Sequence, residues 1–343
     1  MVNSDKADPS RRMLVGGMSA GLMTALAGRA AAQEKTGSQA AATAQASPAE
    51  PALSDPRSKY PQPPYPEQRQ DWPGLVSKMD PRPDHGEESY IGSGRLAGRR
   101  ALITGGDSGM GRAAAIAYAR EGADVAINYL PQEESDAREV IALIEAEGRK
   151  AVALPGDLRD AAFCRQLVED AVRELGGLDI LVSNAARQQA KKSLSDISDD
   201  EFDWTLKTNV YAMFWLTKAA LPHLQPGSTI IVTTSVVAYD PPEMLVDYAM
   251  TKAAGRNFVK SMAKQLGSQG IRINGVAPGP IWTPLQPSGG QFPEDIPQFG
   301  SDQPLGRAGQ PVELAGIYVL LASDENSYAT GQVYGAVGGS GGP

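Results

Sequence analysis

From residue 99 onward, the chain alternates short aliphatic and β-branched runs with longer segments of helical periodicity. The expected strands lie at 100–104, 124–128, 151–154, 179–182, 229–234 and 271–276, with a shorter one near 332–335. The expected helices lie near 109–121, 133–147, 160–175, 199–222, 247–268 and 311–322. Because strands that alternate with helices form βαβ units, the pattern predicts an α/β fold. We expect a doubly wound parallel sheet of the Rossmann type, covered by helices on both faces.

The first 32 residues have the pattern of an export signal. Paired Arg11 and Arg12 precede a mildly apolar run at 13–27, and small residues follow at 30–32. The run is shorter than the roughly 20 residues that span a bilayer, so no stable membrane anchor is expected. The arginine pair resembles the twin-arginine signal. We expect a periplasmic mature chain that begins near Gln33, or a cytoplasmic protein if the signal is not used; fractionation of cells that express the full chain tests this.

Two segments separate this signal from the predicted globular domain at 95–343. Residues 33–60 are rich in Ala, Gln, Ser and Pro, which predicts a flexible linker. Residues 61–94 are rich in proline, which disfavours helix and regular sheet, but they also carry scattered aromatic residues. We expect an extended arm that lies across the globular domain or a neighbouring subunit. His85, in a polar turn of this arm, is interpreted as a turn residue and not as a metal ligand.

Composition narrows the possible chemistry. The 343 residues carry a net charge of −8, which argues against a general affinity for nucleic acid. The single cysteine, Cys164, cannot form an intramolecular disulfide, and no Cys/His cluster offers a metal site. The two histidines, His85 and His223, stand in unrelated contexts, so a Ser-His-Asp triad is not expected. An organic cofactor acting on a small molecule fits this composition best.

A glycine-rich turn follows the first predicted strand. Residues 104–111 read T-G-x-x-x-G-x-G, and such glycines let the backbone approach a pyrophosphate at the start of the next helix. In dinucleotide-binding folds, an acid at the end of the second strand bonds the adenosine ribose. Here residues 127–131 contain no acid, and the first one is Glu133. The missing carboxylate favours NADP(H), but no Arg or Lys replaces it, so NAD(H) stays an alternative.

A second group of residues suggests acid–base chemistry. Ser235 directly follows the strand at 229–234, on the edge of the sheet where ligands bind. Tyr248 and Lys252 are four residues apart on one predicted helix, so their side chains share a face. A nearby ammonium is expected to lower the tyrosine pKa from its usual value near 10. A phenol that moves a proton, beside a nicotinamide that moves a hydride, needs neither a metal nor a nucleophile.

Together these motifs resemble the short-chain dehydrogenase/reductase family, in its single-domain branch, over about residues 95–339. By this resemblance, Asn209, Ser235, Tyr248 and Lys252 form the catalytic tetrad, with Asn209 holding a water in a proton relay to Lys252. Ala186 departs from the family, which usually has glycine there. The resemblance also implies a set of cofactor-binding residues. These are Tyr248 and Lys252 again, with Gly105, Asp107, Ser108, Gly109, Met110, Gly111, Tyr129, Leu130, Asp157, Leu158, Asn184, Ala185, Pro278, Gly279, Ile281 and Thr283.

The arm and several loops resemble one subgroup of this family. It contains bacterial NADP-dependent aldehyde reductases and glucose/ribitol dehydrogenase-like proteins, and it implies a homotetramer. We therefore expect reversible, NADP(H)-dependent reduction of an aldehyde or carbonyl. A sugar or polyol dehydrogenase and a non-catalytic, cofactor-sensing protein are the alternatives. The aromatic and acidic segment 281–304 is expected to cover the substrate, and a disordered loop is the alternative there.

Overall fold

The computed structural model describes residues 53–343. The predicted export signal and residues 33–52 of the predicted linker lie outside the described residues. Within 53–343, none of the helices combines the length and the apolar character that a membrane crossing requires.

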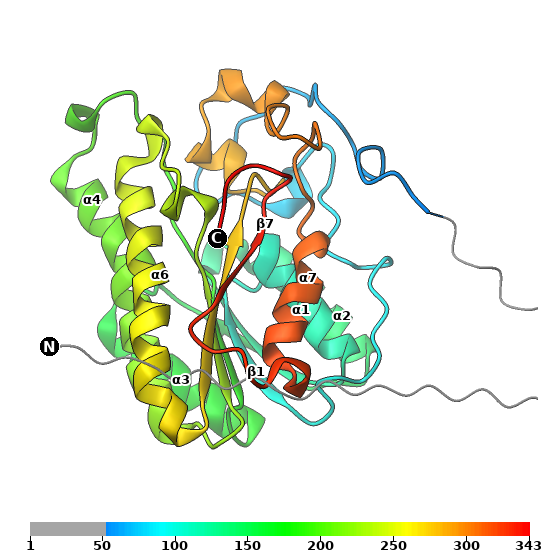
Figure 1. Ribbon diagram of the computed structural model, residues 1–343, viewed down its shortest axis with the longest axis vertical. Coiled ribbons are helices and arrows are strands. Elements are labelled where there is room, and N and C mark those ends of the chain that lie inside the picture. Colours follow the sequence, from blue (N-terminus) through cyan, green and yellow to red (C-terminus); the bar gives the residue numbers. More distant parts are fainter. Residues whose placement is uncertain (1–52) are drawn as a thin grey trace, which may run out of the picture. The chain divides into compact units, whose positions relative to one another are not determined.

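The described chain contains a parallel sheet in the order β3-β2-β1-β4-β5-β6-β7 (Figure 1). The strands are β1 (Arg100–Thr104), β2 (Asp124–Tyr129), β3 (Ala151–Pro155), β4 (Ile180–Ser183), β5 (Thr229–Thr233), β6 (Arg272–Pro278) and β7 (Val333–Ala336). The order reverses where β1 pairs with β4, with Leu102 opposite Leu181. Ligands of open parallel sheets bind beyond the carboxyl ends of the strands at such a reversal. The predicted α/β doubly wound fold is confirmed.

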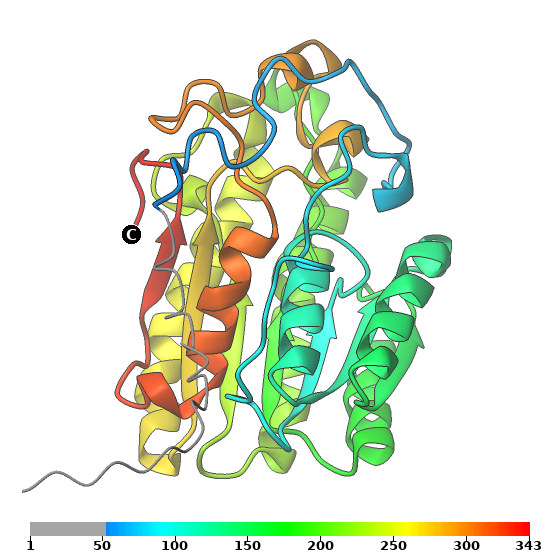
Figure 2. The same ribbon diagram turned by 90° about the vertical axis from the view of Figure 1, so that its right-hand side faces the viewer.

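Helices cover both faces of the sheet, as Figures 1 and 2 show. On one face lie α1 (Gly109–Arg120), α2 (Glu134–Ala146) and α7 (Val312–Ala322). The other face carries α3 (Ala161–Leu175), α4 (Asp199–Leu206), α5 (Ala212–Ala220) and α6 (Val246–Leu266). Neighbouring strand residues divide between the two cores: Ile103 packs under α1, whereas Leu102 packs under α3 and α5. This alternation is why the strands read as continuous apolar runs.

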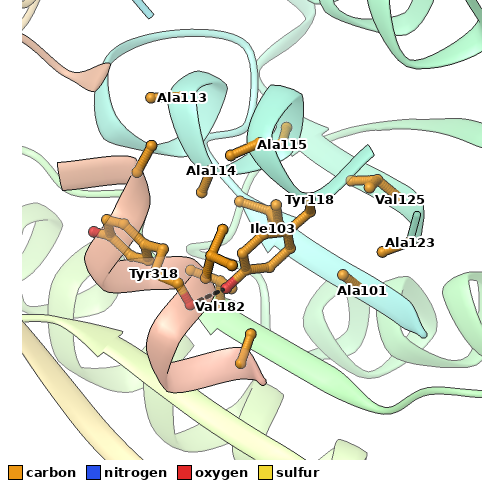
Figure 3. Close-up of a cluster of buried hydrophobic side chains, with 14 of the residues drawn as sticks. Ala101, Ile103, Ala113, Ala114, Ala115, Tyr118, Ala123, Val125, Val182 and Tyr318 are labelled. Carbon is orange, nitrogen blue, oxygen red and sulfur yellow. Dashed lines mark hydrogen bonds between the residues drawn. The ribbon is translucent and has the colours of Figure 1, made fainter. Parts of the chain in front are cut away.

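The α1 face is packed through small side chains (Figure 3). Ala113, Ala114 and Ala115 are fully buried and allow α1 to approach β1 and β2 closely. Beside them, the Tyr118 hydroxyl donates to the backbone oxygen of Tyr318, 3.1 Å away, and joins α1 to α7. Burying a tyrosine requires a partner for its hydroxyl, and this bond provides one. The last turn of α1 is thereby tied to α7.

The predicted helix at 199–222 is interrupted. It divides into α4, a π-helical turn η4 (Lys207–Tyr211) and α5. The start of α4 is a capping box in which Ser198 and Glu201 each accept from the other's backbone N–H at 3.2 Å. A π turn adds one residue to the helical repeat, and apolar periodicity does not reveal it. The turn carries Asn209, which matters for the site below.

The described part of the arm lies across its own domain, on the segment 281–304. The ring of Tyr65 stacks on that of Trp282, with centroids 4.2 Å apart, and the Trp282 Nε1 donates to the Pro81 oxygen at 2.8 Å. The Tyr65 amide also donates to the Pro297 oxygen at 2.9 Å. Segment 281–304 forms two short helical turns, η9 (Gln286–Gly290) and η10 (Pro293–Gln298), so it is not a disordered loop. We call it the cover segment.

His85 lies inside the protein and not in an open turn. Its ring is fully buried, and Nδ1 lies 3.1 Å from the Glu87 Oε1. Burial lowers the His85 pKa, although Glu87 opposes this effect. Among residues 53–343, no group of three or more His, Cys, Asp or Glu side chains is placed to hold a metal ion.

Candidate active site

A cleft of about 570 Å³ lies beyond the carboxyl ends of the strands. The glycine turn after β1 lines it, together with the residues that follow β2 to β6 and parts of the arm and of the cover segment. Of the predicted site residues, all line this cleft except Gly111 and Asn209. The fold therefore gathers side chains that are more than a hundred positions apart in the sequence.

The turn after β1 forms a cradle that only glycine can build. Gly105 and Gly109 have φ angles of +61° and +52°, in the left-handed region. A Cβ on Gly111 would lie 1.9 Å from the Gly105 oxygen, so Gly111 shapes the turn from behind although it does not line the cleft. Ser108 precedes α1 without capping it through its side chain, so the amides of the first turn lack that partner. Such a helix start fits a pyrophosphate.

Asn184 holds this turn against the end of β4. Its Nδ2 donates to the backbone oxygens of Thr104 at 3.1 Å and of Gly105 at 3.2 Å, and its Oδ1 accepts from the Thr233 hydroxyl at 3.0 Å. The Thr104 hydroxyl oxygen accepts from the backbone amides of Asn184 and Ala185. Since the Asn184 amide is engaged within the protein, its main role is to position the turn, although the residue lines the cleft.

Ser235, Tyr248 and Lys252 meet at the other end of the cleft. Ser235 begins the short turn η6 (Val236–Ala238) directly after β5, and the other two lie on α6. All three are buried. The Lys252 Nζ lies 5.3 Å from the centre of the Tyr248 ring and donates to the Thr233 backbone oxygen at 2.8 Å. The tertiary structure thus places an alcohol, a phenol and an amine beside the same cleft.

Burial dominates the pKa values of this group. It raises the pKa of Tyr248 above its usual value of 10, although the Ser235 hydroxyl has a lowering effect. Burial also lowers the pKa of Lys252 to about 7. Both shifts follow from the loss of water around the charged form. The expected lowering of the Tyr248 pKa by Lys252 is therefore not found in this structure. Tyr248 is instead a neutral phenol at physiological pH, which is the form that donates a proton.

Asn209 lies behind the cleft, in the π turn. Its Nδ2 donates to the Arg187 oxygen at 2.9 Å and to the Thr251 hydroxyl at 3.0 Å, while its Oδ1 accepts from the Arg187 amide at 2.8 Å. The Thr251 hydroxyl in turn donates to the Tyr248 backbone oxygen at 2.7 Å. These bonds connect the π turn to the part of α6 that carries Tyr248 and Lys252. The relay of a proton through a water to Lys252 stays a prediction.

Several cleft residues were not identified from the sequence. Trp72 of the arm lies edge-on to Trp204 of α4 with ring centres 5.1 Å apart, and both line the cleft. The Arg159 guanidinium lies 4.1 Å from the Trp204 ring centre and pairs with Asp157, whose pKa it lowers against the effect of burial. The aromatic residues scattered through the proline-rich arm were the available signal. Sequence alone did not show where the arm would lie.

Known proteins share this architecture. A family model described as enoyl-(acyl carrier protein) reductase matches residues 105–340. An uncharacterized oxidoreductase of Bacillus subtilis is 60% identical over 80% of this chain and 92% of its own. The chloroplastic NADPH-dependent aldehyde reductase 1 of Arabidopsis thaliana is 43% identical over 78% and 95%, and the glucose and ribitol dehydrogenase of Daucus carota is 41% identical over 80% and 96%.

Solved structures agree with these relatives. A short-chain dehydrogenase from Burkholderia cenocepacia, crystallised in complex with NADP, superposes with a TM-score of 0.67 at 37% identity, over 71% of this chain and 98% of that one. The chain belongs to the short-chain dehydrogenase/reductase family of oxidoreductases.

Proposed function

We propose that this protein is an NADP(H)-dependent reductase of a small aldehyde or other carbonyl compound. The observation that carries the proposal is the buried group of Ser235, Tyr248 and Lys252 in the same cleft as the open start of α1. The glycine cradle fits a pyrophosphate, and the relatives include an NADPH-dependent aldehyde reductase and a structure with NADP. The cleft thus joins a dinucleotide site to an acid–base group.

In this reaction the bound nicotinamide cofactor supplies the hydride. The Ser235 hydroxyl holds the carbonyl oxygen, and the Tyr248 phenol donates its proton to that oxygen. Burial raises the Tyr248 pKa, so the phenol is protonated through the neutral range but is a weaker acid than a free tyrosine. Lys252 would hold the nicotinamide ribose, and its ammonium would return a proton to the Tyr248 phenolate that the transfer leaves. The low exposure of all three side chains keeps water from the reacting oxygen.

The cover segment suggests the class of substrate. Phe299, Glu294, Asp295 and Asp302 all line the cleft from this side. Aromatic and acidic groups together suit a small polar or amphipathic carbonyl compound and repel an anionic one. A sugar or polyol would meet the same groups, so a glucose/ribitol-type dehydrogenase is the second candidate, and the Daucus carota relative supports it. A non-catalytic sensor of the cofactor has no need for a buried Ser-Tyr-Lys group.

The first test is an assay of the mature chain, from Gln33, with NADPH or NADH and a panel of aldehydes and aldoses. We expect turnover with NADPH and aldehydes. Because the Lys252 pKa is lowered to about 7, this group loses its proton between pH 6 and 9, so reduction should slow as pH rises through that range, whereas alcohol oxidation, which needs the phenolate, should accelerate. Cofactor binding without turnover of any carbonyl or alcohol would support the sensor, and turnover of aldoses or polyols alone would support the sugar dehydrogenase.

We also propose that the chain assembles as a homotetramer. Tyr211, Phe214 and Met250 are 42%, 49% and 52% exposed, and the π turn and α6 that carry two of them are in contact. Exposed large apolar side chains on adjoining helices are typical of an interface between subunits. Sedimentation velocity of the mature chain should give the mass of four chains. A Phe214→Glu, Met250→Glu double variant should dissociate, and a wild-type monomer would contradict the proposal.

A further inference from the structure

Asp107 is a buried acid whose carboxylate forms no hydrogen bond of normal geometry with the described protein. It lies in the turn between β1 and α1 and is 1% exposed. Leaving a buried carboxylate unpaired is costly, so such a group needs an explanation. Asp107 also lines the cleft, which makes a bound ligand the candidate for its missing partner.

A second acid, Glu133, lines the same part of the cleft. It lies in the turn η2 (Pro131–Glu133) after β2, and its Oε2 accepts from the Leu130 amide at 2.9 Å. Burial raises the Glu133 pKa, and the charge of Asp107 raises it further. Tyr129, at the end of β2, also interacts with Asp107, and its hydroxyl donates to Glu134 at 2.6 Å.

The other charged groups around this pair do not neutralise it. Asp136 of α2 adds a third carboxyl and accepts from the Val76 amide at 2.6 Å. Arg112 of α1 is the nearby cation, but its guanidinium donates to Glu87 at 3.1 Å and to Glu139 at 2.9 Å. Among the cleft residues that the structure describes, Lys252 is the sole Lys or Arg, and it belongs to the catalytic group. A phosphate near Asp107 would therefore lie near carboxyl groups, with no Lys or Arg side chain of the cleft lining to balance its charge.

The position of the pair identifies the part of the cofactor that it faces. The Gly106 amide donates to the Asn128 oxygen at 3.1 Å, so the glycine turn lies against the carboxyl end of β2. In dinucleotide-binding folds this is where an acid bonds the adenosine ribose. The end of β2 has no acid of its own, but the fold brings Asp107 from one side and Glu133 from the other.

We propose that Asp107, assisted by Glu133, reads the adenosine ribose and sets the selectivity between NADP(H) and NAD(H). As a carboxylate, Asp107 accepts a hydrogen bond from a ribose hydroxyl and repels a 2′-phosphate. As a carboxylic acid, it donates to that phosphate. The chain therefore uses both cofactors, with a preference that depends on pH. This proposal depends on the proposed function in one respect: a nicotinamide dinucleotide must bind in the cleft.

The protonation of the pair gives the direction of this dependence. Burial, with a further contribution from Asp136, raises the Asp107 pKa to about 7, against the lowering effects of its own backbone amide, the Ser108 hydroxyl and Arg112. Burial and the charge of Asp107 raise the Glu133 pKa to about 9. Below these values the carboxyls are neutral and tolerate a phosphate. As pH rises through them the pair becomes negative, so NADPH affinity should fall relative to NADH affinity.

The test compares Asp107→Asn with the wild type by fluorescence titration of NADPH and NADH at pH 8, without a substrate. The variant keeps the size of the side chain and cannot ionise. We expect its ratio of Kd for NADH to Kd for NADPH to rise by about tenfold or more, as removal of a like-charge contact predicts. Glu145→Gln is the matched control, because it removes the same charge from an exposed side chain of α2 that lies outside the cleft lining. Its ratio should stay within about twofold of wild type, since exposed charges are screened.

The same titrations between pH 6 and 9 test the proposal on the unchanged protein. The wild-type ratio of Kd for NADH to Kd for NADPH should fall as pH rises, and it should fall less steeply in Asp107→Asn. The ionisation of the cofactor phosphate affects both proteins equally, so the difference between the two slopes reports the ionisation of Asp107. A wild-type ratio that is independent of pH, or an Asp107→Asn ratio equal to that of the wild type, would overturn the proposal. Because these are binding measurements, they stand even if no aldehyde proves to be a substrate.

Discussion

Tyr248→Phe is expected to lower kcat for carbonyl reduction by about 10²–10⁴-fold, the contribution of a positioned proton donor. The substitution removes one hydroxyl and keeps the ring, which is buried and contributes to the wall of the cleft. The phenol is the group that can protonate the carbonyl oxygen, because the Lys252 Nζ is directed to the Thr233 oxygen. Steady-state kinetics measure the loss. The Kd for NADPH should change little, since the glycine cradle at the far end of the cleft is intact.

Tyr239→Phe is the matched control for this experiment. Tyr239 lies on the connection between β5 and α6, outside the cleft lining, with the Arg256 guanidinium 4.8 Å from its ring centre. Removing its hydroxyl should leave kcat within about twofold of wild type, as is usual away from a functional site. Wild-type turnover by Tyr248→Phe would refute the assigned proton donor, and an equal loss in both variants would indicate a structural effect.

Trp282→Ala is expected to lower the free energy of unfolding by about 3–5 kcal/mol, the cost of deleting a fully buried large aromatic side chain. Trp282 is 0% exposed and packs between Tyr65 of the arm and Phe299 of the cover segment. Its Nε1 also donates to the Pro81 oxygen. The substitution therefore leaves a cavity where the arm joins the cover segment. Urea denaturation followed by circular dichroism measures the effect.

Trp282→Phe separates packing from hydrogen bonding. It keeps an aromatic ring and removes the Nε1 donor, so we expect less than half of the loss seen with alanine. Because the cover segment lines the cleft, Trp282→Ala should also raise KM for the carbonyl substrate more than it changes the Kd for NADPH. An unchanged urea midpoint in Trp282→Ala would show that the arm does not stabilise the cover segment.

Local patterns predicted most of the fold and the centre of the site. The predicted strand 100–104 coincides with β1, and the predicted helix 109–121 ends within one residue of α1. Periodicity, glycine spacing and the i, i+4 pair of Tyr248 and Lys252 are all properties of short segments, so they are readable without a structure. The π turn at Lys207–Tyr211 was missed because it changes the repeat without interrupting the apolar pattern.

The electrostatics of the site could not be predicted in the same way. From the sequence, Lys252 is a neighbouring cation that lowers the Tyr248 pKa. In the structure both groups are buried, and the loss of water around their charged forms raises the Tyr248 pKa and lowers the Lys252 pKa. Burial depends on every element that packs around α6. A helical spacing carries no information about it.

The sequence by itself determined the alternating strands and helices, the glycine cradle and the pairing of Tyr248 with Lys252, because each depends on neighbouring residues. The export signal at Arg11 and Arg12 stays a prediction of the sequence. Only the tertiary structure decided that the arm lies on the cover segment through Trp282, and that Asp107 and Glu133 line the same cleft. These contacts join segments that are distant along the chain, and their energies depend on packing and on the exclusion of water.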